Sequence, residues 1–210
     1  MLIHFDECDF LIGIGILCIL LFVLRWKKRS LAYLIFFSIF WIYLLFVVQI
    51  VIFPIAINTD NSIRAMPSIN LIPFYTGYCS MPRYCLMDFV GNIILTMPFG
   101  FGINFLVRIK PKNFLWLASA LGFGFEFSQL VISLAFRSGF RTIDINDAIL
   151  NAIGVLTGYT LFRAFAWLYI KSTEYFGIEN KWLFSDIYHV AIQAQAYTVL
   201  KQNPRPPTCG

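Results

Sequence analysis

Apolar runs of about 20 residues recur along this chain, and they constrain its fold more than any other feature. A helix needs about 20 apolar residues to cross the ~30 Å hydrocarbon core of a bilayer. We therefore predict an all-α fold, a polytopic bundle of about five transmembrane helices. In a four-span alternative, the first and shortest run is only embedded in the membrane. The five runs are residues 10–26, 31–57, 88–107, 114–136 and 147–170.

The composition also indicates a membrane protein. Hydrophobic residues make up 59% of the 210 residues and charged residues only 13%, and the mean hydropathy is +0.74. The net charge of +5 comes from short basic clusters between apolar runs, which argues against a nucleic-acid partner. The Cys and His residues lack metal-site spacing, so we expect no metal and no cofactor. Cys79 and Cys85 share one predicted loop and could form a disulfide in an oxidising compartment.

The distribution of Lys and Arg predicts the orientation of the bundle. With five spans, the basic residues of segments 25–29 and 108–112 and of the tail after residue 170 fall on one side of the membrane. The side richer in Lys and Arg usually faces the cytoplasm. We therefore expect a multi-pass plasma-membrane protein with its N-terminus outside and its C-terminus in the cytoplasm.

Two segments between or after the spans also carry apolar residues. Residues 68–78, SINLIPFYTGY, are too few to span the membrane, so we expect them to lie at the interface or to dip back into the bundle. Residues 181–200 alternate apolar and polar residues at roughly helical spacing, which predicts an amphipathic helix on the membrane surface. We divide the chain into a transmembrane domain, residues 1–170, and a cytoplasmic tail, residues 171–210.

Polar residues in the last three spans lie on single helix faces. Residues three or four positions apart are neighbours on a helix surface. Each stripe lies in the half of its span that is predicted to be external, and Glu126 is ~15 Å from the external end of its helix at 1.5 Å per residue. The stripes therefore predict one polar cleft that opens to the outside. Their members are Asp88, Asn92 and Thr96, then Glu126 and Gln129, then Asp147 and Asn151.

Two residues of the loop before the last span complete the candidate ligand-binding site, Arg141 and Asp144. Arg141 could pair with Asp144 or Asp147, or it could offer positive charge to an anionic headgroup or phosphate. Asp88, Asp144 and Asp147 could hold a divalent cation, although nothing else in the sequence favours one.

Small residues suggest how two of the helices pack. Gly154 and Gly158 continue the face of Asp147 and Asn151, and their GxxxG spacing is typical of helices that approach closely. In the third span, we expect Pro98 to break or kink the helix.

Four motifs in this order resemble the VanZ-like family of bacterial membrane proteins: NLIPF (70–74), NIILTMPFGF (92–101), EFSQ (126–129) and RTIDINDAILNAIGVLTGY (141–159). The resemblance covers about residues 30–165 and implies an integral membrane protein of Gram-positive-type bacteria. The family's named member gives low-level resistance to the glycopeptide teicoplanin. The family's polar motif positions are here Asn92, Glu126, Gln129, Asp144, Asp147 and Asn151, and the resemblance implies no catalytic role for them.

We therefore expect an envelope-facing protein whose cleft binds a membrane-lipid-linked cell-wall precursor or a glycopeptide and which contributes to teicoplanin resistance. Three alternatives remain open. An enzyme acting on an envelope lipid or glycan could use two carboxylates as acid and base. A proton-coupled transporter could use Glu126 as its proton site. In a scaffold, Glu126 would bond to Asn92 or Asn151 only to hold the helices together.

Overall fold

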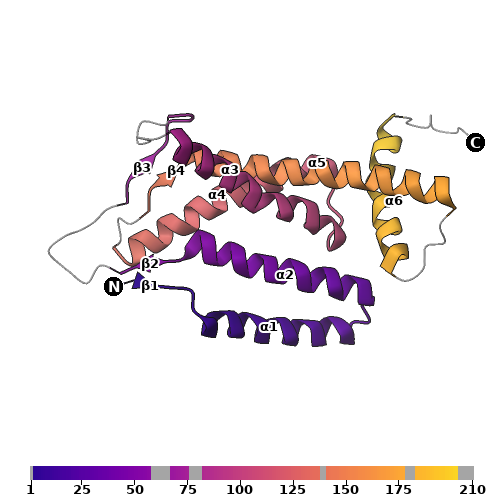
Figure 1. The fold of residues 1–210 in the computed structure, drawn as a ribbon, viewed down its shortest axis with the longest axis horizontal. Helices are drawn as coiled ribbons and strands as arrows, with labels where there is room; N and C mark the ends of the chain where they lie inside the picture. Colours follow the sequence, from indigo (N-terminus) through magenta and orange to yellow (C-terminus); the bar gives the residue numbers. More distant parts are fainter. Residues whose placement is uncertain (1, 58–66, 76–81, 138–140, 178–182, 203–210) are drawn as a thin grey trace, which may run out of the picture.

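The computed structural model describes residues 2–57, 67–75, 82–137, 141–177 and 183–202. Most of these residues are helical, and five of the helices are long and apolar enough to cross a membrane, which confirms the predicted fold class. The spanning helices are α1 (Glu7–Trp26), α2 (Leu31–Ile52), α3 (Pro82–Gly102), α4 (Pro111–Ala135) and α5 (Ile145–Phe176). A short 3₁₀ turn, η1 (Ile103–Phe105), follows α3, and α6 (Leu183–Gln202) crosses one end of the bundle (Figure 1).

Local signals explain where the helices begin and end. Proline suits the first turn of a helix, and α3 begins at Pro82, earlier than the predicted residue 88. The second apolar run continues to residue 57, but α2 ends at Ile52 because Pro54 disfavours helical backbone at the residue before it. Gly177 ends α5 with a φ of 58°, a left-handed conformation that glycine adopts at little cost. The helix thus runs past residue 170, and the predicted division into domain and tail stays a prediction.

Two short β-bridges, which the sequence did not predict, join loops at one end of the bundle. There β1 (Leu2–Ile3) pairs antiparallel with β2 (Ile55–Ala56), and β3 (Ile69–Asn70) pairs parallel with β4 (Ile143–Asp144). We call this the strand end. We call the opposite end the basic end, because it carries Arg25, Lys27, Lys28, Arg29, Arg108, Lys110 and Lys112.

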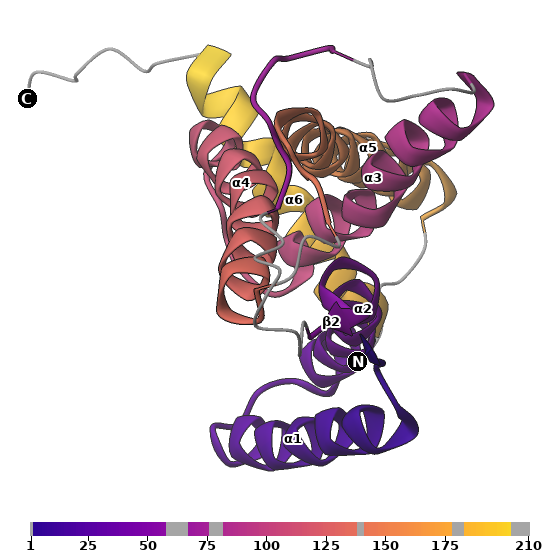
Figure 2. The same ribbon diagram turned by 90° about the vertical axis from the view of Figure 1, so that its left-hand side faces the viewer.

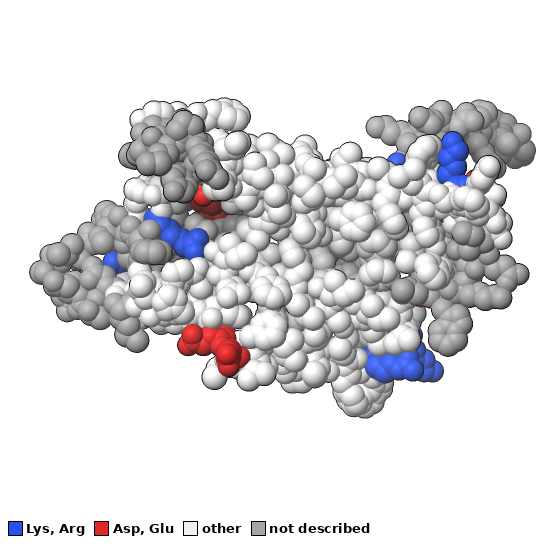
Figure 3. Space-filling model, in the orientation of Figure 1, with Lys and Arg blue, Asp and Glu red and all other residues white. Residues whose placement is uncertain are grey.

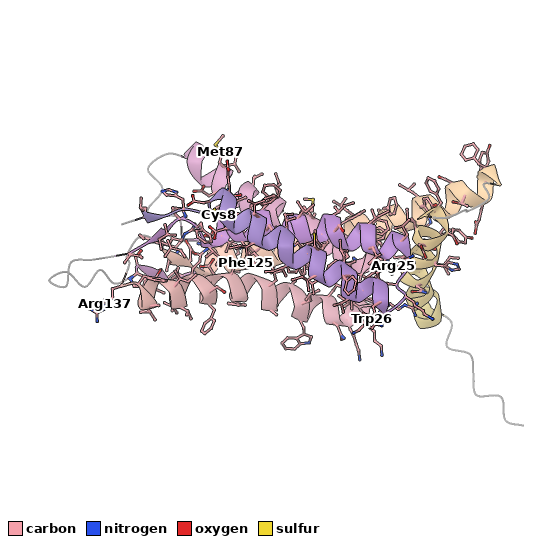
Figure 4. All side chains as sticks on the ribbon, turned by 90° about the horizontal axis from the view of Figure 1, so that it is seen from below. Cys8, Arg25, Trp26, Met87, Phe125 and Arg137 are labelled. Atoms are coloured by element: carbon pink, nitrogen blue, oxygen red, sulfur yellow. The ribbon has the colours of Figure 1, made fainter. Side chains whose placement is uncertain are left out.

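The charged residues lie at the two ends of the molecule. Figure 3 shows Lys, Arg, Asp and Glu side chains near either end and a white band of uncharged atoms between them. Arg25 and Trp26 lie at the basic end and Arg137 at the strand end (Figure 4). Large apolar side chains of the band are exposed, including Ile12, Phe22 and Phe123, as in a surface that faces lipid.

Helices α3, α4 and α5 pack through glycines. A Cβ atom added to Gly154 would overlap the Thr96 hydroxyl, and one added to Gly158 would overlap the Met97 carbonyl oxygen. Gly122 of α4 approaches the Ala148 carbonyl of α5 in the same way. These approaches confirm the predicted close packing. Helix α3 continues through Pro98 to Gly102, so Pro98 does not break the helix, and the alternative of a kink stays a prediction.

The first and last helices lie at the edges of this core. Helix α1 packs against α2 at one side of the molecule (Figure 2). The Trp41 indole donates to the Gly13 carbonyl at 3.0 Å. The predicted tail helix is present as α6 and packs on α5. The Arg163 side chain donates to the Ala194 carbonyl, and Ala191 is buried, so α6 is fixed against the basic end of the bundle.

Candidate functional site

A polar pocket of about 330 Å³ lies at the strand end. Four helices and the segment before α5 form it, so two carboxylates, three carboxamides and one guanidinium share a space inside an otherwise apolar bundle. We call this the polar pocket. Phe125, one of its apolar lining residues, is labelled in Figure 4. The full lining is Ile50, Val51, Asn92, Leu95, Phe125, Glu126, Gln129, Arg141, Thr142, Asp147 and Asn151.

The structure brings six of the predicted site residues together around the polar pocket. The helical stripes of α3, α4 and α5 do meet in one place, and Arg141 joins them from the segment before α5. Whether these residues bind a ligand stays a prediction. The six are Asn92, Glu126, Gln129, Arg141, Asp147 and Asn151.

The other three predicted residues do not line the polar pocket. Asp88 is exposed on α3. Thr96 is fully buried between α3 and α5. Its hydroxyl lies 3.0 Å from the backbone carbonyl oxygen of Asn92 and 2.8 Å from that of Asn151. Asp144 caps the start of α5, because its Oδ1 accepts the Asn146 backbone N–H at 2.8 Å. Thr96 and Asp144 therefore hold helices and loops in place.

Glu126 fixes the start of α5 against α4. Its Oε2 accepts the backbone N–H of Asp144 at 2.9 Å, and the side chain is 7% exposed. The structure shows no bond from Glu126 to Asn92 or Asn151, the two partners of the scaffold alternative. This contact places Glu126 level with the start of α5. The depth predicted for Glu126 in the membrane stays a prediction.

Arg141 binds the end of α2. Its Nη2 donates to the carbonyls of Ile50 at 3.1 Å and Phe53 at 2.7 Å, at a helix end where carbonyls lack partners within the helix. The predicted pairing with Asp144 or Asp147 is therefore not formed. Burial lowers the pKa of Arg141, while the nearby charge of Glu126 raises it. Its Nε is buried and has no hydrogen-bond partner in the described part of the chain.

Two carboxamides of the polar pocket connect neighbouring helices. Asn92 of α3 donates to Asp147 Oδ1 of α5 at 2.7 Å. Gln129 of α4 donates to the Val51 carbonyl of α2 at 3.1 Å. Each contact joins two helices that are distant in sequence, so the pocket walls are held together by the same groups that line the space.

Asn151 differs from the other carboxamides of the polar pocket. Its side chain is 3% exposed, and its Oδ1 has no hydrogen-bond partner among the described residues. An unpaired buried acceptor costs about 1–3 kcal/mol. A carbonyl kept in this state beside an open polar space is therefore suited to accept a hydrogen bond from a molecule that enters it.

Sequence reasoning missed two asparagines that hold a loop over the start of α5. Asn70 donates to Asp144 Oδ1 at 3.1 Å and accepts the Ile72 N–H at 3.1 Å. Asn146 accepts the Phe74 N–H at 2.6 Å. Asparagine often forms turns, so the sequence contained a weak signal for these residues. The partner of Asn146 lies 72 residues away, however, and only the tertiary structure shows it. Thr142, also missed, is exposed and lines the polar pocket.

These asparagines hold the described part of the predicted interfacial segment, residues 68–78, in its position at the strand end. Leu71, Ile72 and Phe74 are 71%, 62% and 81% exposed, so the described part of this segment does not dip back into the bundle as one alternative predicted. It docks through Asn70 and leaves its apolar side chains on the surface. Residues 76–78 of the segment lie outside the described residues.

The structure gives no support to the alternative of a bound cation or to the possible disulfide. No group of three His, Cys, Asp or Glu side chains gathers as around a metal ion in the described ranges, so the cation alternative on Asp88, Asp144 and Asp147 has no geometric basis. Cys79 lies outside the described residues, so its pairing with Cys85 stays a prediction.

A protein-family model described as VanZ/LLP1 matches residues 37–168. The match begins within α2 and ends within α5, so it includes every residue of the polar pocket and excludes α1 and α6. No curated protein and no solved structure matches the chain significantly. The matched region covers more than half of the sequence and contains the motifs that suggested the resemblance. The chain is therefore a multi-pass membrane protein of the VanZ/LLP1 family.

Proposed function

We propose that the polar pocket binds a headgroup rich in hydroxyl and amide groups, carried by a lipid-linked component of the bacterial envelope. Asn151 carries this proposal, because its buried Oδ1 lines the pocket and has no partner among the described residues. A ligand that brings an O–H or N–H to this oxygen removes the cost of leaving it unpaired.

The two carboxylates favour the same kind of ligand. Glu126 and Asp147 each hold one protein contact through a single oxygen, Oε2 and Oδ1 respectively. No described residue donates to the second oxygen of either group. These oxygens can accept hydrogen bonds from sugar hydroxyls or peptide amides, which are charge-assisted when the carboxylate is ionised. A sugar or short peptide headgroup therefore matches the lining better than a purely anionic one.

The size and place of the pocket suggest a headgroup with its lipid still in the bilayer. A volume of about 330 Å³ is near the lower end of the ~300–1,000 Å³ of small-molecule sites, enough for a sugar ring or a short peptide. Ile50, Leu95 and Phe125 form apolar parts of the wall. A lipid-linked cell-wall precursor could insert its headgroup at the end of the bundle while its chain stays beside the helices. The larger glycopeptide teicoplanin could insert only one of its sugars or side chains.

We infer that the strand end faces outside, which supports this choice of ligand. The Lys and Arg residues of the basic end predict a cytoplasmic location for it. A C-terminal green fluorescent protein fusion should then fluoresce, and a C-terminal alkaline phosphatase fusion should be inactive. An active phosphatase fusion without fluorescence would reverse the orientation and put the polar pocket in the cytoplasm.

A titration in nanodiscs tests the proposed function. A lipid-linked cell-wall precursor and, separately, teicoplanin are added to wild-type protein, to Asn151→Leu and to Gln49→Leu. Asn151→Leu removes the unpaired acceptor and keeps the branched shape of the side chain, so affinity should fall about tenfold or more, or about 1.4 kcal/mol, with the fold retained. Gln49 is an exposed amide of α2 outside the pocket lining, so its variant should bind normally. The proposal would be overturned if the wild-type protein bound neither probe. It would also be overturned if Asn151→Leu bound as tightly as the wild type.

One observation favours catalysis as a second candidate, since Glu126 and Asp147 line the same pocket. The precursor incubated with wild-type protein would then be converted, and both Glu126→Gln and Asp147→Asn would abolish the conversion. Saturable binding without conversion of the precursor would leave binding as the function.

A further inference from the structure

A second pocket of about 260 Å³ lies at the basic end, far along the helices from the polar pocket. It opens between the start of α2, the segment after α3 and the crossing helix α6. Its charged lining side chains are Arg29, Arg108 and Asp186, and His189 of α6 also lines it. We call it the basic pocket.

An apolar pocket of about 560 Å³ adjoins the basic pocket. Phe36 and Phe105 line both spaces, and their rings stack with centroids 4.5 Å apart. The two pockets therefore share a wall, polar and charged on one side and apolar on the other.

The apolar pocket extends from the basic end into the membrane-spanning part of the bundle. On α2 it is lined by Phe36, Ile39, Phe40 and Tyr43, whereas the basic pocket is lined at Ser30, Ala32 and Tyr33. From the start of α2 at Leu31 to Tyr43 the helix rises ~18 Å. This is slightly more than half of the ~30 Å hydrocarbon core. A molecule in both pockets would have its polar part at the membrane surface and its apolar part reaching about to the middle of the bilayer.

We propose that this composite site binds a single glycerophospholipid whose headgroup carries a hydrogen-bond donor. The phosphodiester faces Arg29 and Arg108, and one acyl chain occupies the apolar pocket. Neither arginine forms an ion pair with a described residue, and the Arg29 guanidinium lies over the Tyr33 ring at 5.1 Å. Two guanidinium groups at the membrane surface suit a phosphate.

Asp186 determines which headgroups the site prefers. This carboxylate lines the basic pocket beside the two arginines, so it can accept a hydrogen bond from the ammonium of ethanolamine or a hydroxyl of glycerol. The quaternary ammonium of choline has no N–H or O–H to donate. Asp186, His189 and Gln193 come from α6, which lies outside the VanZ/LLP1 match, so this site depends on a helix added to the matched region.

Native mass spectrometry of the full chain tests this lipid site. The purified protein is equilibrated with phosphatidylglycerol, phosphatidylethanolamine and phosphatidylcholine of matched acyl chains at equal amounts, and retained lipid is counted. We expect one lipid to be retained per chain. The retained amount of phosphatidylglycerol or phosphatidylethanolamine should exceed that of phosphatidylcholine at least about fivefold. The variant Arg29→Gln/Arg108→Gln should lose retention at least about tenfold, and Asp186→Leu, which has no acceptor, should remove the preference over phosphatidylcholine. These expected changes correspond to about 1 to 1.4 kcal/mol.

Two controls keep the test decisive. Lys27→Gln/Lys112→Gln removes the same charge from the basic end at residues that do not line the basic pocket, so its lipid retention should stay normal. Soluble glycerol phosphate should not displace the lipid, because the acyl chain contributes binding. Equal retention of all three lipids, an equal loss in the lysine variant, or displacement by glycerol phosphate would overturn the proposal. All variants are checked for normal binding at the polar pocket, which this site does not share.

Discussion

One face of α5 meets α3 in two different ways. Toward the strand end it carries Asp147 and Asn151, which line an open polar space. Toward the basic end it carries Gly154 and Gly158, where the two backbones touch and a single added carbon would not fit. The closely packed half holds α3 and α5 at a fixed separation. Because this separation is fixed, the polar pocket between their other halves stays open. We infer that the glycines mainly provide stability and the polar residues mainly provide binding.

The largest expected effect is on the closely packed half. Gly158→Ala puts a Cβ into the Met97 carbonyl oxygen, and overpacking of this kind costs about 3 kcal/mol. We expect a strongly reduced melting temperature and little monodisperse protein in fluorescence-detected size exclusion. Gly91→Ala is the matched control on α3, because a Cβ there meets no atom within 4 Å. If Gly158→Ala is as stable as Gly91→Ala, the close packing of α3 and α5 is not what fixes the pocket.

The next effect separates the two roles of Glu126, which are to hold the start of α5 and to line the polar pocket. Glu126→Leu leaves the Asp144 N–H without its acceptor and should lower the free energy of unfolding by about 2 kcal/mol. Glu126→Gln retains a carbonyl oxygen for this N–H, so its stability should change by less than about 1 kcal/mol. Both variants should bind the precursor more weakly, because the pocket loses a carboxylate. Equal destabilisation by Gln and Leu would show that the charge of Glu126 holds the fold.

The smallest effect is expected at Asp88, which continues the α3 stripe but is exposed outside the polar pocket. Asp88→Asn should change the free energy of unfolding by no more than about 0.5 kcal/mol, as for most surface substitutions. Its precursor affinity should equal that of the wild type in the nanodisc titration. A loss of binding as large as that of Asn151→Leu would show that the site extends beyond the polar pocket along α3.

Helical periodicity was enough to predict which faces of α3, α4 and α5 meet. Spacings of three and four residues placed Asn92, Glu126, Asp147 and Asn151 on single faces, and apolar surroundings require such residues to turn toward one another. The same logic predicted the GxxxG contact of α5. Spans were located well because about 20 apolar residues are needed wherever a helix crosses a bilayer.

Loop contacts could not be predicted in this way, because they depend on residues far apart in sequence. Nothing local indicates that Arg141 binds the end of α2 across 88 residues, or that Asn70 reaches Asp144. Thr96 has the spacing of a site residue, yet close packing of α3 and α5 buries it completely. Periodicity gives the face on which a side chain lies, but only packing decides whether that face is open or closed.

Cryo-electron microscopy of the protein in nanodiscs, with and without a saturating lipid-linked cell-wall precursor, tests the central claim most directly. We predict added density in the polar pocket only in the presence of the precursor, with a donor atom within ~3.2 Å of Asn151 Oδ1. Identical pocket density in the two maps, or precursor density elsewhere on the protein, would contradict the assignment of this pocket as the binding site.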